Sequence, residues 1–119
     1  MKRRLRLQSR RDFDRVIHGR RVFAGQAVVA FASPNPSGGW RVGVTVSRRV
    51  RGAVLRNRVR RVLREVARRR LLPADPDSQA ADRGIGYDVV LIGRPALASL
   101  PFPVVEEEAA AVRARLAQP

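Results

Sequence analysis

Residues 48–70 read RRVRGAVLRNRVRRVLREVARRR, and the rest of this 119-residue chain can be placed around them. From about residue 54 the apolar side chains recur at the spacing of an α-helix with one buried stripe. They are Leu55, Val59, Val62, Leu63 and Val66. The opposite side carries Asn57, Arg60, Arg61, Arg64 and Arg68, while Arg56 and Arg58 lie on the two flanks near the start. The sequence therefore predicts a helix with a guanidinium-rich exposed face.

Charge is used unusually in this stretch. It holds eleven arginines against the single acid Glu65, so we expect that i,i+4 pairing along the helix does not relieve the repulsion. Arginines in a first helical turn oppose the partial positive charge of the helix start, which favours anions. A bound phosphate would supply the missing negative charge. An ordinary solvated face of a basic protein stays open as the alternative.

The composition locates the basic surface and limits the function classes. Residues 1–70 hold 21 Lys and Arg against 3 acids, out of 25 and 10 in the whole chain. A polyanion-binding surface is therefore expected in the first two-thirds. Only Lys2 among the cations is a lysine, which suits bidentate phosphate contacts but equally fits a GC-rich genome. The absence of cysteine excludes disulfides and thiolate metal sites, and fits a reducing cytoplasm.

No targeting or membrane segment is predicted. No apolar run approaches 18 residues, and the start MKRRLRLQSRR has no hydrophobic core of a signal peptide. We expect a single domain over residues 1–119 in the cytoplasm. Within it, residues 1–8 are expected to be a flexible basic arm and residues 73–86 a flexible connector.

The remaining elements follow in chain order. Ser9 is the expected N-cap of a short helix that ends near Gly19. A strand over residues 22–33, which can be broken near Gly25, precedes a turn at residues 33–39 and a half-buried strand at residues 40–47. The continuous apolar run at residues 87–93 predicts a central strand. A last helix is expected from Pro103 to about residue 117, with residues 106–108 at the favourable end of its dipole. The order is α-β-β-α-β-α, and if the second and third strands are neighbours they should be parallel.

Two side chains of the first helix have competing interpretations. Phe13 is either a core residue or a platform on which a base stacks. His18, next to the expected helix end, is interpreted as a capping or surface residue. On the strand at residues 40–47, the face with Gly43, Thr45 and Ser47 is small and polar, which leaves room for a ligand or for plain solvent.

The acids Asp12, Asp14, Glu65 and Asp88 are scattered and there is one histidine. They form no recognisable constellation for side-chain hydrolysis. No glycine-rich phosphate loop follows a strand.

The segments RVGVTVSRRV, RGAVLRNRVRRVLREVAR and YDVVLIGRPA together resemble the bacterial ribonuclease P protein subunit. This small basic protein is the partner of a catalytic RNA that trims the 5′ leader from precursor tRNA. The most specific part is Arg56-Asn57-Arg58, followed by the basic pair Arg60-Arg61. With RDFDRVIHG upstream, the resemblance covers residues 5–117.

The resemblance implies an α/β (α+β) two-layer sandwich, ribosomal protein S5 domain 2-like, with a mixed sheet and a left-handed β-α-β crossover. It also implies a helix that contacts the RNA subunit and a cleft that holds the leader. We assign RNA binding to Arg48, Arg49, Arg56, Asn57, Arg58, Arg60, Arg61, Arg64 and Arg68. We assign the leader cleft to Phe13, Ile17, Thr45 and Ser47.

Two positions depart from the family pattern. Ile17 and Ala30 stand where other members often have aromatic residues. Leader stacking is then expected either to be weaker or to use the neighbouring Phe31, which strand alternation places on the face opposite Ala30.

The sequence is thus interpreted as the protein subunit of an endoribonuclease, with catalysis by the RNA and Mg²⁺ and no catalytic or metal-holding side chain of its own. Its expected partners are the catalytic RNA and precursor tRNA, with no membrane. A ribosomal RNA-binding protein of similar fold and a DNA-binding helix module are the alternatives, the second disfavoured because no helix pair joined by a turn precedes the arginine helix.

Overall fold

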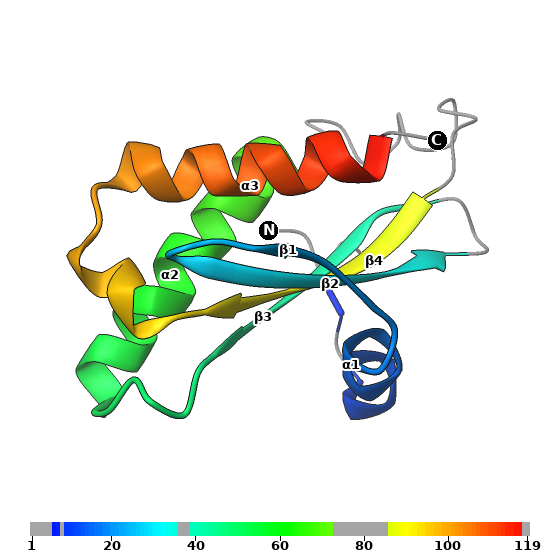
Figure 1. Cartoon of the computed structure of the whole chain (residues 1–119). Helices are drawn as coiled ribbons and strands as arrows, with labels where there is room; N and C mark the ends of the chain where they lie inside the picture. The colour runs from blue at the N-terminus through cyan, green and yellow to red at the C-terminus, as the bar shows by residue number, and fades with distance from the viewer. Residues whose placement is uncertain (1–5, 8, 36–38, 73–85, 118–119) are drawn as a thin grey trace.

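The computed structural model describes residues 6–7, 9–35, 39–72 and 86–117 (Figure 1). Its elements are α1 (Arg10–Ile17), β1 (Arg20–Ala24), β2 (Val28–Asn35), β3 (Arg41–Val46), α2 (Ala53–Arg70), β4 (Gly86–Gly93), the 3-10 helix η3 (Pro95–Ser99) and α3 (Phe102–Ala117). The expected arm, the connector up to residue 85 and residues 36–38 of the expected turn lie outside the described residues, apart from Arg6 and Leu7.

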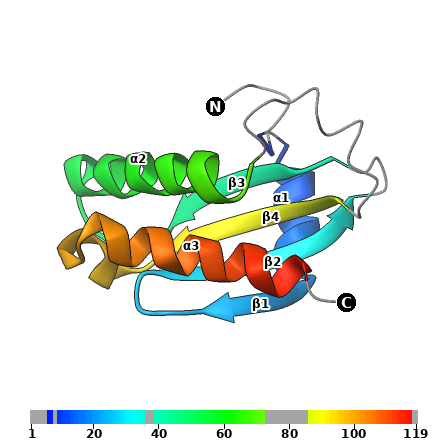
Figure 2. The same ribbon diagram turned by 90° about the horizontal axis from the view of Figure 1, so that it is seen from above.

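The four strands form one mixed sheet in the order β1-β2-β4-β3. β4 is a central strand, antiparallel to β2 and parallel to β3, as the sequence predicts. The chain passes from β3 through α2 to β4. Seen from the side of α2 and α3, with both strands pointing the same way, this crossover is left-handed (Figure 2). The expected exception to the right-handed rule is confirmed.

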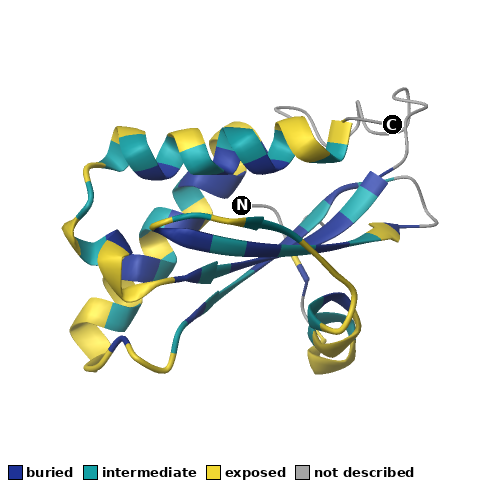
Figure 3. Ribbon diagram, viewed as in Figure 1, coloured by how far each residue is buried: buried dark blue, intermediate teal, exposed yellow. Residues whose placement is uncertain are grey.

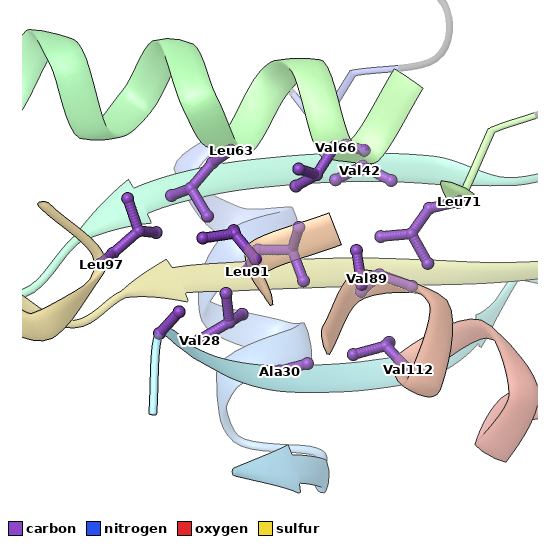
Figure 4. Packing of buried hydrophobic residues seen from close by; sticks show 14 of the residues in the cluster. Val28, Ala30, Val42, Leu63, Val66, Leu71, Val89, Leu91, Leu97 and Val112 are labelled. Atoms are coloured by element: carbon purple, nitrogen blue, oxygen red, sulfur yellow. The ribbon is translucent and has the colours of Figure 1, made fainter. Parts of the chain in front are cut away.

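Helices cover both faces of the sheet unequally. α2 and α3 lie together on one face, and α1 lies on the other (Figure 1). The main core forms between the sheet and the helix pair, where β2 contributes Val28 and Ala30 and β4 contributes Val89 and Leu91 (Figure 4). These side chains alternate along their strands, so the same strands present a second set of residues to α1.

The buried stripe of α2 begins one turn later than predicted. Val59, Leu63 and Val66 are fully buried and Val62 is half-buried. Leu55 is 36% exposed and its neighbour Val54 is 86% exposed, so the expectation that Leu55 belongs to the core is wrong. Figure 3 shows the first turn of α2 as exposed, because no described element covers it.

Strand pairing sets the bounds of β1 and β2. The break expected near Gly25 is confirmed, since the segment at residues 22–33 is two strands, joined where Gly25 donates its amide to the carbonyl of Val28. β2 then continues to Asn35, into the segment predicted as a turn, because residues 33–35 pair with β4. β1 pairs with β2 only as far as Ala32, so Pro34 meets a free edge on that side, where proline is tolerated.

The start of α3 is also different. It begins at Phe102, and its first turn holds no acidic residue, so the expected dipole role of residues 106–108 is wrong. Glu108 instead accepts hydrogen bonds from the amides of Ala27 and Val28 at 3.1–3.2 Å. These contacts fasten α3 to the hairpin between β1 and β2. No helix within the described ranges is long and apolar enough to cross a membrane.

Candidate nucleic-acid interface

The loop that leads into α2 leaves the N-terminal end of this helix exposed to solvent. Gly52, the N-cap residue, has φ of 92°, and a Cβ added there would meet nothing within 4 Å. Glycine suits this left-handed conformation, which strains other residues. The first turn has no acidic side chain and no side-chain cap. The positive end of the α2 dipole is therefore left for an external anion.

Arg56 fixes the geometry of this loop. Its guanidinium donates to the carbonyls of Ser47 and Val50 at 3.0 Å and of Val46 at 3.3 Å, and the residue is half-buried. It therefore joins the first turns of α2 to the end of β3. RNA binding by Arg56 stays a prediction, but its guanidinium already makes three hydrogen bonds within the protein.

The basic surface consists of the exposed polar side chains of the loop and of the first three turns of α2. Its members are Arg48, Arg49, Arg51, Asn57, Arg58, Arg60, Arg61 and Arg64. All are exposed except Arg60, which is half-buried and donates to Asn57 Oδ1 at 3.1 Å. None of the seven arginines has an acidic partner among the residues that the structure describes. Their charge is thus uncompensated within the described part of the protein.

The far end of α2 is different. Glu65 accepts hydrogen bonds from Arg68 at 2.6 Å and Arg69 at 2.9 Å, and these bonds lower the pKa of its carboxyl to about 2. Glu106 of α3 pairs with Arg70 at 2.6 Å and with Arg69 at 3.2 Å. The expectation that pairing gives no relief is wrong here. Arg68 is engaged by Glu65, so its predicted contact with RNA would compete with an ion pair.

A second candidate surface lies on the α1 face of the sheet. Phe13, Ile17, Phe31 and Ile92 are half-buried around the fully buried Val16 and the buried Leu7 and Val90. Hereafter these four half-buried residues are called the apolar cleft, a name taken from the leader cleft to which Phe13 and Ile17 are assigned. The Phe13 ring lies against Gly43, where an added Cβ would come within 2.4 Å of it. The ring is thus anchored on the sheet and still partly open, so it can pack and stack at once.

The strand registers place the other predicted cleft residues. Thr45 pairs with Ile92 and is half-buried on the same face, so the structure brings it to the apolar cleft. Ser47 lies after β3, where its amide donates to Gly93 and its hydroxyl accepts from the amide of Arg49. Ser47 therefore belongs to the loop before α2 as much as to the cleft.

The positions of Ala30 and Phe31 resolve one question from the sequence. Ala30 is fully buried in the main core, under α2 and α3. Phe31 packs on the α1 face with Phe13, so it lies opposite Ala30 as strand alternation predicts. The expectation that position 30 faces the leader cleft is wrong, and Phe31 is the aromatic residue of β2 on that face.

The capping interpretation of His18 is confirmed. Its Nδ1 lies 2.7 Å from the carbonyl of Asp14, at the C-terminal end of α1. Ser9 accepts from the amide of Asp12 at 3.0 Å, as expected of an N-cap. No three His, Cys, Asp or Glu side chains among the described residues are grouped so that they could hold a metal ion.

A basic cleft at the edge of the sheet has no signal in the sequence. About 500 Å³ of space lies between β1 and the end of α3, lined by Arg20, Arg21 and Arg115 with Tyr87 and Leu116. The Arg115 guanidinium is held by the Val22 carbonyl at 2.9 Å. No sequence pattern links these positions, because only the sheet edge brings them together.

The fold and these surfaces define a small basic α+β protein suited to binding nucleic acid, in which an arginine-rich crossover helix and an apolar cleft occupy opposite faces of one sheet. The family described as Ribonuclease P matches residues 1–117. The chain belongs to this family.

Comparisons with individual proteins agree with this family assignment. The ribonuclease P protein component of Ruegeria pomeroyi is 44% identical over 100 residues, which cover 81% of this chain and 73% of that protein. The protein of the same name from Roseiflexus castenholzii is 36% identical over 107 residues, or 89% and 80% of the two chains. The solved RNase P protein from Thermotoga maritima superposes with a TM-score of 0.70 at 27% identity, covering 92% of this chain and 96% of that one.

Proposed function

We propose that this protein is the protein component of a ribonuclease P ribonucleoprotein, which removes the 5′ leader from precursor tRNA in the cytoplasm. The observation that carries the proposal is the match of nearly the whole chain to the ribonuclease P family. The basic surface and the apolar cleft support it, because they give the protein separate places for two RNA segments of different character.

The basic surface is the proposed contact with the RNA subunit. Arg58, Arg61 and Arg64 follow one another at the i, i+3 spacing that aligns side chains along one side of a helix. With the loop arginines and the open helix start, they can neutralise several phosphates of a folded RNA. Guanidinium groups also pair bidentately with phosphate oxygens, which fixes orientation as well as affinity.

The apolar cleft is the proposed contact with the leader. A single-stranded leader exposes its bases, and stacking of a base on an aromatic ring is worth about 1–3 kcal/mol. Phe13 and Phe31 offer two partly open rings there. Mature tRNA lacks those bases and gains nothing from them.

Catalysis is assigned to the RNA subunit with Mg²⁺. Ion pairs engage Asp12, Glu65, Asp88 and Glu106, and backbone amides engage Glu108. The described residues offer no grouped set of three metal ligands. Mg²⁺ in the assembled particle would activate water and stabilise the leaving oxygen at the scissile phosphate. The protein binds the RNAs and reduces their mutual repulsion.

Replacing Phe13 tests the leader contact. In the reconstituted particle, Phe13→Ala should lower affinity for precursor tRNA by about fivefold or more through lost stacking, and leave affinity for mature tRNA nearly unchanged. The affinities of both substrates are measured with folded variant protein, using Val112→Ala in α3 as a core-truncation control on the opposite face. An unchanged ratio between the two substrates would show that Phe13 serves only the core.

A further inference from the structure

A buried carboxylate lies beneath α1. Asp88 of β4 is 0% exposed, on the α1 face of the sheet. Its Oδ1 accepts from Asn35 Nδ2 at 3.1 Å and from Arg41 Nε at 3.0 Å, and its Oδ2 accepts from Arg41 Nη2 at 2.8 Å and from Arg15 Nη2. The partners come from β2, β3 and α1, so Asp88 joins three elements at one point.

A second carboxylate completes the charge balance. Asp12 of α1 lies 3.7 Å from Arg15 and 3.6 Å from Arg41. Two acids therefore face two arginines, and the hydrogen bond to Asp88 raises the pKa of Arg41. Arg15 also donates to Ser33 Oγ at 3.1 Å. A buried charge with this many partners is costly to break.

The same helix carries the cleft residues. Phe13 lies between Asp12 and Arg15 in sequence, and its ring packs on Gly43, two residues along β3 from Arg41. α1 has only eight residues, too few to be stable alone. It contacts the sheet through the small apolar cluster around Val16 and through this ionic cluster. The positions of Phe13 and Ile17 therefore depend on both the apolar cluster and the ionic cluster.

We propose that, within the ionic cluster of Asp88, Arg15, Arg41 and Asp12, the ion pair between Arg15 and Asp88 positions α1 so that Phe13 and Ile17 lie where the leader binds. Arg15 and Asp88 are then positioning residues for leader recognition, although neither touches the leader. The inference rests on the proposed leader contact of the cleft. It predicts that discrimination between precursor and mature tRNA changes when α1 is released from Asp88.

Two matched substitutions test this. Arg15→Gln and Arg41→Gln each remove one positive charge, and each leaves Asp88 with one arginine and Asn35. Only Arg15→Gln removes the direct contact between α1 and Asp88, since Arg41 reaches α1 through Asp12 alone. In the reconstituted particle, Arg15→Gln should lower the ratio of precursor to mature affinity by about threefold to tenfold, while Arg41→Gln should keep it within about twofold.

Hydrogen exchange of the α1 amides in the folded protein gives a readout without RNA. The amides of Phe13 and His18, bonded to Ser9 and Asp14, should exchange faster in Arg15→Gln than in Arg41→Gln. Equal affinity ratios or equal exchange in the two variants would overturn the positioning role. Phe13→Ala distinguishes failure of the positioning role from failure of the leader contact itself. If Phe13→Ala lowers the affinity ratio while Arg15→Gln does not, only the positioning role fails. If Phe13→Ala leaves the ratio unchanged, the leader contact fails first.

Discussion

Arg56 and Arg58 lie two residues apart in α2 and have different surroundings. The guanidinium of Arg56 binds three backbone carbonyls at the end of β3 and in the loop that follows. Arg58 is exposed, with no hydrogen bond from its side chain to a described residue. The pattern Arg-Asn-Arg thus combines one arginine that shapes the interface with one that is free to bind.

Alanine substitutions should separate these two arginines. Arg56→Ala removes a donor from three carbonyls, although that of Ser47 keeps a second donor, the amide of Val50, so we expect a loss of about 1–3 kcal/mol in the free energy of unfolding. Arg58→Ala should leave the melting temperature nearly unchanged and weaken binding to the catalytic RNA. Thermal melts and RNA binding are measured for both variants. If Arg58→Ala proves the less stable protein, the assignment of the two side chains is reversed.

Residues that the sequence could not assign share a physical reason. Periodicity shows which side of an element is apolar, and it predicted Val59, Leu63 and Val66 correctly. It does not show where a neighbouring element ends, so Leu55 was misassigned. Alternation correctly puts Phe31 opposite Ala30, but the family pattern does not show that position 30 faces the main core in this chain.

At the scale of elements, α2 is divided by its charges. The arginines of the loop and of the first three turns have no acidic partner among the described residues, while those of the last turn are paired with Glu65 and with Glu106 of α3. Arg69 and Arg70 thereby connect α2 to α3 on the side away from the loop. The binding surface is consequently shorter than the run of arginines in the sequence suggests.

The pairing of Glu65 with Arg68 and Arg69 should make the stability of the protein depend on pH in the acid range. Its pKa in the folded protein is about 2, below the ordinary 4.5, because Arg68 and Arg69 donate to it. Its contribution to stability is therefore fully present above pH 4.5 and is lost as the pH falls toward 2. The difference in unfolding free energy between the natural protein and Glu65→Gln should shrink as the pH falls through this window. At high salt this change with pH should be smaller, because screening already weakens the ion pairs. A difference that stays constant with pH at low salt would contradict the pairing.

Most elements followed from the sequence, and the exceptions are those fixed by contacts between distant segments. Ser9, the apolar run of β4 and the α2 stripe carry local signals. The extension of β2 to Asn35 depends on pairing with β4, and the contact of Glu108 with Ala27 depends on how α3 crosses the sheet. The cluster around Asp88 joins four elements, so no sequence spacing could indicate it.

For the whole molecule, the arrangement separates the basic surface from the apolar cleft. α2 and α3 cover one face of the sheet, and the apolar cleft lies with α1 on the other (Figure 1). Under the proposed function, binding of the RNA subunit by the basic surface would leave the cleft open to a different strand. One protein of 119 residues would then contact an RNA partner and a substrate leader at the same time.

Salt dependence should distinguish the arginines of the basic surface from the paired arginines at the end of α2. Removal of a phosphate-contacting arginine such as Arg61 should flatten the dependence of log affinity for the RNA subunit on log salt by about 0.7 to 0.9 units. Arg70→Gln, which removes an arginine paired with Glu106, is the matched control and should flatten it less. The slopes come from binding isotherms at several salt concentrations. Equal flattening by both variants would mean that total charge, and not the basic surface, determines binding.

The most direct test of the account is cleavage of precursor tRNA by a ribonuclease P RNA, with and without this protein, over a range of Mg²⁺ concentrations. The protein alone should release no leader in Mg²⁺. Added to the RNA, it should increase cleavage most at low Mg²⁺ and low salt, where repulsion between the two RNAs is least screened, and the gain should shrink as either rises. Cleavage by the protein without RNA, or an RNA whose activity the protein leaves unchanged at low Mg²⁺, would contradict the account.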